Sequence, residues 1–205
     1  MLDILKPEFM VTILVALATS GTFIAALKFV EKIYMRLTQK VSLDKELSLI
    51  SKAYVMMQDV VATTTCSRVI LFAGHNSGGV PRLGSPFYTT AIHSVYGEGV
   101  LAQTDYKELS VDAHYISMLN DTIRDGRSDL IVGNLQDSHL KDYYAMEGVT
   151  ESVIFYLTMK DNCLYYISFA TMNEEGFSSI EKTKLELKAA SIARCLIKSY
   201  GGYRV

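Results

Sequence analysis

The sequence predicts an α+β fold in which an antiparallel sheet is flanked by helices and preceded by one N-terminal transmembrane helix. Two neighbouring strand patterns, 151–159 and 164–172, are separated by a turn and predict an antiparallel hairpin. Helical patterns lie on both sides of this hairpin in the sequence, an order typical of layered α+β domains. An uncharged apolar stretch, 9–27, precedes all of them and has the length of a membrane-spanning helix.

The uncharged stretch 9–27 is FMVTILVALATSGTFIAAL, and it follows a segment of mixed charge, 1–8. A helix rises about 1.5 Å per residue, so this stretch spans about 28 Å, close to the ~30 Å hydrocarbon core of a bilayer. A cleaved signal peptide is the main alternative, but its apolar region is about 7–15 residues long and follows a basic start. We therefore favour a retained anchor, with the lipid bilayer as its partner.

Basic residues are concentrated on the C-terminal side of this anchor. Only Lys6 and the amino terminus precede it, whereas a group of basic residues follows within 28–41. Cytoplasmic flanks carry the excess of Lys and Arg, so this bias predicts a single-pass protein of the inner (plasma) membrane. Its N-terminus would lie outside and its C-terminal domain in the cytoplasm, where widely spaced cysteines stay reduced. The basic residues are Lys28, Lys32, Arg36 and Lys40, and the cysteines are Cys66, Cys163 and Cys195.

Helical periodicity continues beyond the anchor in two parts. Residues 28–41 predict a juxtamembrane helix or linker, and 42–63 predict a helix with apolar residues alternately three and four positions apart. This spacing fits a helix that covers the sheet of its own domain, and it also fits a helix that pairs across a dimer. Small residues four positions apart in the anchor, such as Ala16 and Ser20, permit close helix contact. Together, the second interpretation and the small residues predict a homodimer.

The domain predicted over 42–205 contains further elements between this helix and the hairpin. They are a strand, a segment that mixes turn signals with a short helical or extended piece, a helix, a short strand and another helix. The first of these two helices is capped by Asp112 or Ser110 and ends at Gly126. In order, the elements cover 66–75, 85–102, 110–126, 129–135 and 139–148.

The hairpin and the final helix carry the clearest local signals. The phrase KDNC joins the two strands of the hairpin and puts Asp161 and Asn162 at its tip. Ser178 and Glu181 match a capping box, in which each side chain bonds the other's free backbone amide. They predict the start of a final helix with one apolar stripe. The stripe consists of Leu185, Ala189, Ile192 and Leu196.

Composition and motifs narrow the function classes. A net charge of −2 over 205 residues, with no local basic run, argues against nucleic acid as a partner. The loop GHNSGGVPRLGSP, 74–86, has the glycine spacing of a phosphate-binding loop, but Ser85 and Pro86 stand where Lys and Ser or Thr should follow. The same loop does not place a serine as a hydrolase elbow requires. The histidines lack the spacing of a metal site. We therefore expect no catalytic residues and no metal ligands.

Two phrases carry a family resemblance: GVTESVIFYLTMKDNCLYYISFAT, 148–171, and GFSSIEKTKLELKAASIARCL, 176–196. They resemble the GAF domain family of cytoplasmic sensory modules, and the resemblance covers roughly 43–196. In GAF domains a G-[VI]-x-S strand leads into a hairpin, and an F-[ST]-x-x-[DE] phrase opens the final helix. Tyr156 departs from the family pattern, because many members have proline there. The phrase SRVILFAGHNSGG also looks like the opening of small membrane-anchored GAF-like proteins of bacteria and phages. The matching residues are Gly148, Val149, Ser152, Phe177, Ser178 and Glu181.

The resemblance implies an antiparallel sheet of about six strands, with helices behind it and a ligand pocket in front. It leaves the cofactor unknown, because GAF domains bind cyclic nucleotides, tetrapyrroles, haem or other small molecules, and some bind nothing. We place the candidate pocket between the sheet and 74–96. His and Asn side chains there can hydrogen-bond a ligand, an Arg can bind an anion, and a Tyr can line the wall. These candidate ligand-binding residues are His75, Asn76, Arg82 and Tyr88.

Two functions agree with these observations. In the first, the chain is a non-enzymatic, membrane-anchored cytoplasmic GAF-like module for sensing or interaction, which binds a small molecule and acts through an unidentified protein partner. In the second, it is a phage or bacterial membrane-acting protein, in lysis or host-membrane takeover, whose degenerate GAF-like scaffold oligomerises. Discrete dimers in crosslinked membranes favour the first function, and larger assemblies favour the second.

Overall fold

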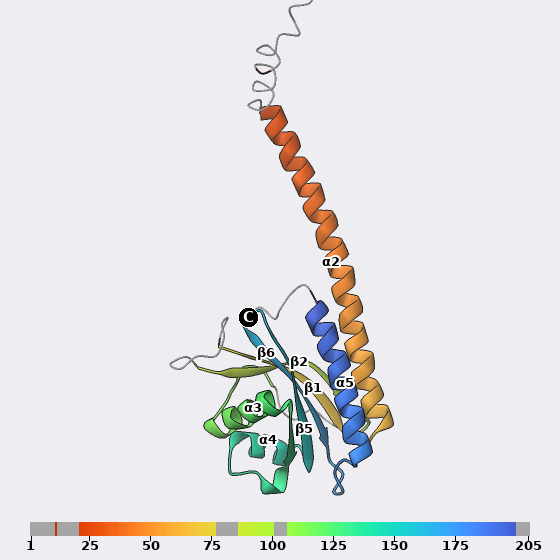
Figure 1. The fold of residues 1–205 in the computed structure, drawn as a ribbon, viewed down its shortest axis with the longest axis vertical. Coiled ribbons are helices and arrows are strands. Elements are labelled where there is room, and N and C mark those ends of the chain that lie inside the picture. The colour runs from red at the N-terminus through yellow and green to blue at the C-terminus, as the bar shows by residue number, and fades with distance from the viewer. Residues whose placement is uncertain (1–10, 12–20, 77–85, 101–105, 200–205) are drawn as a thin grey trace, which may run out of the picture. The chain divides into compact units, whose positions relative to one another are not determined.

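The computed structural model of the chain is shown in Figure 1. The structure describes residue 11 and residues 21–76, 86–100 and 106–199. Contacts divide the chain into two units, 1–46 and 47–205. The described part of the first unit is helical, and the second unit contains a sheet with helices on both of its faces.

The predicted anchor over 9–27 lies mostly outside the described residues. Its last residues, and all of 28–41, belong to helix α2 (Gly21–Thr63). Among the helices within the described ranges, none is both long and apolar enough to cross a membrane. The anchor, its orientation and its small-residue pairs therefore stay predictions.

Six antiparallel strands form one sheet in the order β3-β2-β1-β6-β5-β4, which confirms the predicted α+β class. The predicted hairpin is the pair β5 and β6. The segment with mixed signals is extended and forms β2, and the two-residue strand β3 was too short for any periodicity to predict. The strands are β1 (Arg68–His75), β2 (Tyr88–Tyr96), β3 (Leu109–Ser110), β4 (Arg127–Ile131), β5 (Glu151–Lys160) and β6 (Cys163–Thr171).

The turn between β5 and β6 is formed by the two residues that the sequence singles out. Asp161 has a φ of 49° and Asn162 a φ of 64°. Two successive residues with positive φ are characteristic of the type I′ turn, whose twist matches that of the flanking strands. This turn fixes the register in which β5 and β6 pair, from Lys160 opposite Cys163 onward.

The remaining helices begin and end close to the predicted positions. Asp112 caps α3 by accepting a hydrogen bond from the backbone amide of Tyr115, and Gly126 ends it with a φ of 80°. Ser138 caps α4 in the same way, through the amide of Lys141. The elements are α3 (Ala113–Asp125), the 3-10 turn η2 (Val132–Asn134), α4 (His139–Met146) and α5 (Ser179–Lys198).

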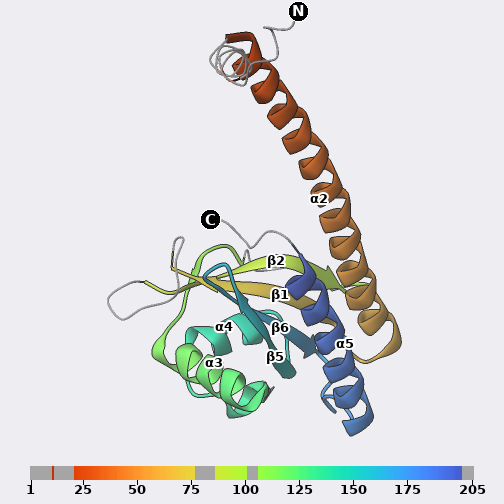
Figure 2. The ribbon, with the colours of Figure 1, turned by 45° about the horizontal axis from the view of Figure 1, so that its top comes forward.

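The helices cover the two faces of the sheet as separate layers. Figures 1 and 2 show α3 and α4 on one face, here called the front face, and α5 with the 47–63 part of α2 on the other, the back face. Each layer encloses its own apolar core. The predicted stripe of α5 is buried at Leu185, Ala189 and Ile192 in the back core. Met57 is buried there too, so this part of α2 covers the sheet of its own domain.

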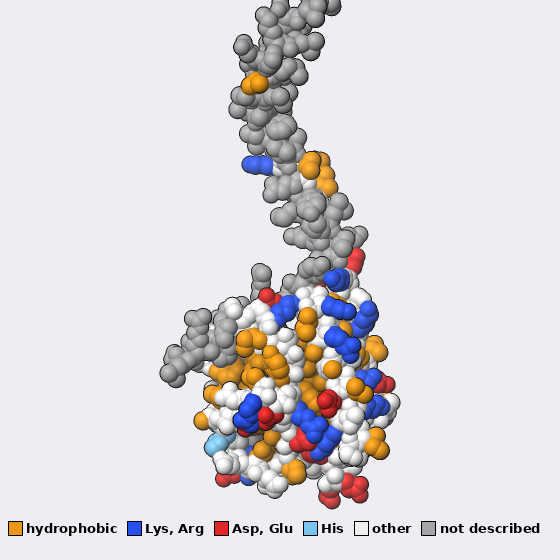
Figure 3. All heavy atoms as spheres, in the orientation of Figure 1, with side chains coloured by type: hydrophobic (Ala, Val, Ile, Leu, Met, Phe, Trp, Pro, Cys, Tyr) orange, Lys and Arg blue, Asp and Glu red, His pale blue; other side chains and the backbone are white. Residues whose placement is uncertain are grey.

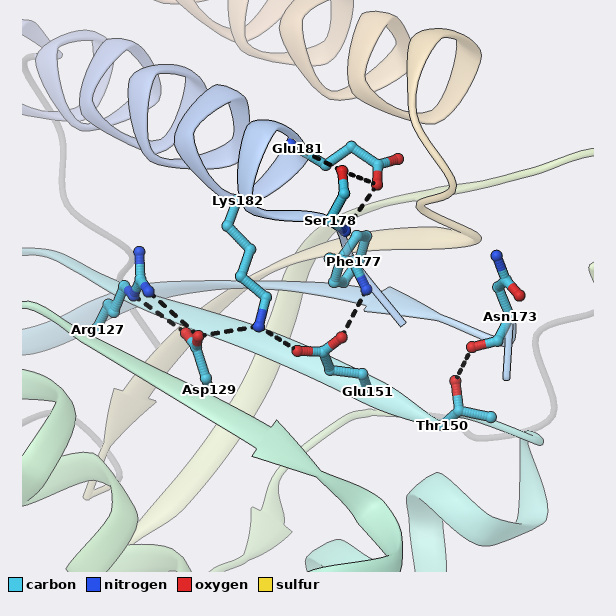
Figure 4. Close-up of polar contacts among 9 residues, drawn as sticks. All are labelled: Arg127, Asp129, Thr150, Glu151, Asn173, Phe177, Ser178, Glu181 and Lys182. Carbon is cyan, nitrogen blue, oxygen red and sulfur yellow. Dashed lines mark hydrogen bonds and ion pairs between the residues drawn. The ribbon is translucent and has the colours of Figure 1, made fainter. Parts of the chain in front are cut away.

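The start of α5 is held by a capping box and by a polar network that reaches the sheet, both drawn in Figure 4. The predicted capping box is confirmed, with Ser178 and Glu181 each bonded to the other's backbone amide. Below it, Lys182 pairs with Glu151 on β5 at 2.6 Å and with Asp129 on β4 at 3.1 Å. Glu151 also accepts a hydrogen bond of 2.6 Å from the backbone amide of Phe177. These contacts fix where α5 begins on the back face.

Replacing Glu181 by glutamine is expected to destabilise the domain at neutral pH and to weaken its acid sensitivity. Burial raises the pKa of this carboxyl, but hydrogen bonds from the amide of Thr65 and from Ser178 outweigh that effect and lower it to about 2, from 4.5 in the unfolded chain. A lowered pKa stabilises the fold above pH 4.5, and this contribution is lost as the pH falls toward 2. Urea midpoints measured from pH 7 to pH 2 test this. An unchanged acid profile in the variant would contradict it.

Candidate functional site

The alternation of side chains along β1 assigns its residues to the two faces. Arg68, Ile70 and Phe72 share one face because successive side chains of a strand point to opposite sides. Ile70 and Phe72 belong to the front core, beneath α3 and α4. Val69 and Leu71 belong to the back core. Arg68 is therefore a charged residue that points into the interior of the front layer.

Arg68 forms a buried ionic group with two residues from distant segments. It pairs with Glu147, which directly follows α4. It also donates a 2.6 Å hydrogen bond to the hydroxyl of Tyr106, which in turn donates a 2.7 Å bond to Glu147. The guanidinium lies 5.5 Å from the ring centre of Tyr106 and 5.3 Å from that of Tyr144. Arg68 is only 1% exposed and Glu147 only 5%, so the pair is shielded from water.

Two atoms of this ionic group lack a hydrogen-bond partner within the described part of the chain. They are Nε of Arg68 and Oε1 of Glu147. Leaving a buried polar group unsatisfied costs about 1–3 kcal/mol, and more when the group is charged. Buried ion pairs stabilise a fold weakly at best, because desolvation offsets their attraction. The pair therefore adds little or no net stability over apolar side chains of similar size.

Two groups of buried hydroxyls extend the polar region across the front face. Tyr144 on α4 donates a 3.0 Å hydrogen bond to Ser152 on β5, and the hydroxyl oxygen of Ser152 lies 2.9 Å from that of Ser168 on β6. All three side chains are buried. Ser152 and Ser168 thus form a polar patch on the front face near the centre of the sheet, and Tyr144 of α4 covers this patch.

The second hydroxyl group connects α3 to the other half of the sheet. The hydroxyls of Tyr115 and Tyr166 lie 2.8 Å apart, and Tyr166 also bonds Thr89 on β2. Burial raises the pKa of both tyrosines above the usual value, and neighbouring tyrosines raise that of Tyr115 further. Both phenols therefore remain neutral and act as hydrogen-bonding groups. The ring of Tyr166 stacks on Phe72, with centres 5.1 Å apart.

An open cleft of about 500 Å³ lies beside the front core, between α3, β4 and the turn that leads to α4. Its inner wall includes Met118, Leu130, Leu135 and Leu140, which belong to the front core or pack against it. Its rim is polar, with His114, Ser117, Asp121, Asp125, Arg127, Ser128, Asp129, Gln136 and Ser138. A small molecule held at this rim would contact α3 and β4 together, next to the layer that covers the buried polar groups.

The structure places two of the predicted ligand-binding residues, His75 and Tyr88, on the face opposite the buried ionic group. His75 and Tyr88 lie opposite each other in the pairing of β1 with β2, with ring centres 6.3 Å apart. His75 alternates with Leu71 along the strand and so shares the back face. It is fully buried, contacts Thr90 at 3.0 Å and has a pKa lowered by burial.

The other two predicted residues follow β1. Asn76 is half-buried at the end of the strand, and Arg82 lies outside the described residues. The structure thus brings His75 and Tyr88 together, but on the face opposite Arg68. None of these observations tests ligand binding, so the four residues stay predictions. Among the residues that are described, no group of three or more His, Cys, Asp or Glu side chains is placed to hold a metal ion.

Sequence reasoning missed the ionic group because its members come from unrelated segments. Arg68, Tyr106 and Glu147 are separated by about 40 residues each, and no motif contains two of them. One signal was available. Arg68 is the first residue of an apolar strand and shares a face with Ile70 and Phe72, because side chains two positions apart point to the same side. Since such an apolar strand is buried on both faces, the charge of Arg68 must be buried too. That argument identifies the arginine, but it cannot identify its partner.

Solved proteins, among them GAF domains, share this fold at low sequence identity. The GAF domain of a two-component sensor histidine kinase from Bacillus halodurans aligns with a TM-score of 0.52 and 12% identity, over 76% of this chain and 97% of its own. A GAF domain/HD domain protein from Geobacter sulfurreducens aligns with a TM-score of 0.52 and 10% identity, over 75% and 92%. A far-red absorbing protein solved in its dark state with bound biliverdin aligns with a TM-score of 0.52 and 8% identity, over 77% and 99%.

These likenesses show that the domain has the GAF fold, as the sequence resemblance implied. No protein-family model matches the sequence, and no curated protein matches it.

Proposed function

We propose that this chain is a non-enzymatic sensory module, anchored in the inner membrane with a GAF-like domain in the cytoplasm. The domain would bind a small molecule on the front face of its sheet, beneath α3 and α4. The GAF fold supports a sensory role by analogy, and one solved protein of this fold holds biliverdin. The apolar stretch 9–27 and the basic residues that follow it support the anchor.

One observation supports this location of the ligand site above all. Arg68 and Glu147 form a buried ion pair in which a donor, Nε, and an acceptor, Oε1, find no partner among the described residues. Buried polar groups without a hydrogen-bond partner are rare in native proteins, and those that occur often have a functional role or bind water or an ion. A ligand that offers an acceptor to the arginine and a donor to the glutamate would satisfy both atoms. The tyrosines beside them, Tyr106 and Tyr144, supply flat apolar walls for such a ligand.

A melting-temperature screen of the full-length chain in detergent tests the proposal. The panel consists of nucleotides and of metabolites that carry a carboxylate or an amide. A true ligand at 100 times its Kd stabilises the folded state by about 2.7 kcal/mol, which corresponds to a rise of about 5–10 °C for a domain of this size. A panel in which no compound raises the melting temperature would contradict the sensory function.

Two variants locate the site once a ligand is found. Glu147→Gln is expected to abolish the ligand-induced rise, because it changes the group that faces the ligand. His75→Gln, on the back face, is the matched control and is expected to preserve the rise. The reverse result would assign the ligand to the predicted group of His75 and Tyr88 instead.

The same proposal includes a homodimer formed by the anchor. Small residues at 16 and 20 would allow two anchors to pack closely, and crosslinking of the chain in membranes is expected to give discrete dimers. The alternative function, a membrane-acting scaffold of phage or bacterial type, predicts larger assemblies. One feature agrees with that alternative, because side chains from the sheet, α3 and α4 fill the front core. A ladder of higher oligomers would therefore overturn the sensory proposal in favour of the scaffold.

A further inference from the structure

A groove of about 510 Å³ lies on the back of the domain, between the 47–63 part of α2 and α5. Figures 1 and 2 both show these two helices side by side. Two contacts hold them in antiparallel order: Lys184 bonds Thr63 at 2.5 Å, and Lys188 pairs with Asp59 at 2.8 Å. The groove is lined by Ser51, Lys52, Val55, Met56, Ser191, Arg194, Cys195 and Lys198.

The floor of the groove is apolar because some apolar side chains of each helix face the other helix and not the sheet. Met57 on α2 and Ile192 on α5 are buried in the back core. The neighbouring positions Val55 and Cys195 line the groove between the helices, and Met56 lines it while also packing against the back core. Val55 is 60% exposed. An exposed apolar strip between two helices is a common feature of surfaces that bind an amphipathic helix.

The rim of the groove carries positive charge only. Its ionisable rim residues are Lys52, Arg194 and Lys198, and no Asp or Glu of the described chain lines it. Arg194 donates hydrogen bonds within its own helix, to the carbonyl of Ala190 and the hydroxyl of Ser191. Within the described ranges, no carboxylate pairs with any of the three. In Figure 3, Lys and Arg side chains gather over α2 and α5, with hydrophobic side chains among them.

We propose that this groove is a docking site for an acidic amphipathic helix of a partner protein. The partner helix would place a leucine-like stripe on Val55 and Met56 and its carboxylates beside Lys52, Arg194 and Lys198. Charge complementarity of this kind selects partners and raises the association rate. A second copy of the chain is a poor occupant, because a two-fold contact through this groove would bring its three cations against the same three cations. A membrane surface fits less well, because the apolar strip lies in a concave site.

The chain contains a natural reporter for this site. Cys195 lines the groove and is half-buried, whereas Cys66 and Cys163 are buried. Burial raises the pKa of the Cys66 thiol to about 12 and also raises that of Cys163, so neither forms the reactive thiolate readily. The rate of maleimide labelling of the folded chain therefore measures access to Cys195.

The experiment uses the full-length chain in nanodiscs of phosphatidylcholine, which has no net charge. The probe is a synthetic helical peptide with leucines spaced three and four positions apart and glutamates on both flanks. The control peptide carries lysine at every glutamate position. The acidic peptide is expected to slow labelling of Cys195 by about tenfold at saturation, and its effect should weaken as salt is added. The lysine peptide is expected to leave the rate unchanged.

Variants of the rim make the test specific. Lys52→Glu and Lys198→Glu are each expected to weaken protection by the acidic peptide by about tenfold or more. Lys107→Glu changes the same charge at an exposed position outside the groove and is expected to leave protection intact.

Three outcomes would overturn the proposal. In the first, both peptides protect equally, so that the groove is merely apolar. In the second, labelling slows when two chains share a nanodisc without any peptide, so that a second copy fills the groove. In the third, phosphatidylserine vesicles protect and the acidic peptide does not, so that the surface binds lipid. Each result is independent of the front-face ligand, so the groove and the ligand site can fail separately.

Discussion

Replacing Glu147 by glutamine is expected to lower the free energy of unfolding of the domain by about 3–5 kcal/mol, the usual cost of breaking a buried ion pair. Glutamine keeps the size of the side chain, so the loss cannot come from a cavity. It comes from the charge of Arg68, which is 1% exposed and then lacks the counterion that the described structure gives it. Tyr106 would still accept a hydrogen bond from the guanidinium, but a neutral hydroxyl cannot balance its charge.

A double variant tests whether the loss of stability comes from the unpaired charge of Arg68 or from altered packing. Arg68→Met together with Glu147→Leu replaces the pair by apolar side chains of similar size, and we expect its stability to lie within about 1 kcal/mol of the original chain. Asp137→Asn removes a fully exposed carboxylate that pairs with Lys141 at the surface, and it is expected to cause no measurable change.

Urea unfolding of the full-length chain in detergent can be followed by the near-ultraviolet circular dichroism of its 13 tyrosines, since the chain has no tryptophan. A loss below about 1 kcal/mol for Glu147→Gln would mean that water reaches Arg68 and that the pair is not truly buried. It would also remove the main support for a ligand site on the front face, because a solvated guanidinium needs no ligand to satisfy Nε.

The sequence predicted well those parts of the fold that depend on residues close together in the chain. The hairpin turn needs two residues that tolerate positive φ, and Asp161 and Asn162 supply them side by side. The capping box needs two side chains three positions apart, and Ser178 and Glu181 satisfy that spacing. Such signals act within one turn of the chain, so the sequence contains them completely.

The candidate site was harder to predict, because it depends on which face of the sheet each residue occupies. Counting along β1 from the apolar Val69 and Leu71 assigns His75 to the same face. The sequence alone does not say which helices cover that face, and two of the predicted pocket residues, His75 and Tyr88, lie on the back. The ionic group of Arg68 and Glu147 arises only when α4 packs on the front, which is a tertiary event without a local signal.

Substitution of Gly176 by alanine is expected to destabilise the domain by about 3 kcal/mol, for two separable reasons. Its φ of 69° lies in the left-handed region, which costs a residue with a Cβ about 1–2 kcal/mol. In addition, the new Cβ would lie 2.2 Å from Oε2 of Glu151, so the carboxylate would have to move. Its hydrogen bond with the amide of Phe177 would then be strained or lost, which adds about 1–2 kcal/mol.

Two other glycines isolate these contributions when each is replaced by alanine. Gly148 has the same φ of 69°, but nothing lies within 4 Å of its added Cβ, so only the conformational cost of about 1–2 kcal/mol is expected. Gly133 has neither a positive φ nor a close neighbour, and its replacement is expected to be neutral or to stabilise by up to about 1 kcal/mol.

The urea midpoint is therefore expected to be highest for Gly133→Ala, lower for Gly148→Ala and lowest for Gly176→Ala. If Gly176→Ala cost no more than Gly148→Ala, Glu151 would be free to rearrange. Its contacts with Phe177 and Lys182 would then contribute nothing to holding the start of α5 on the sheet.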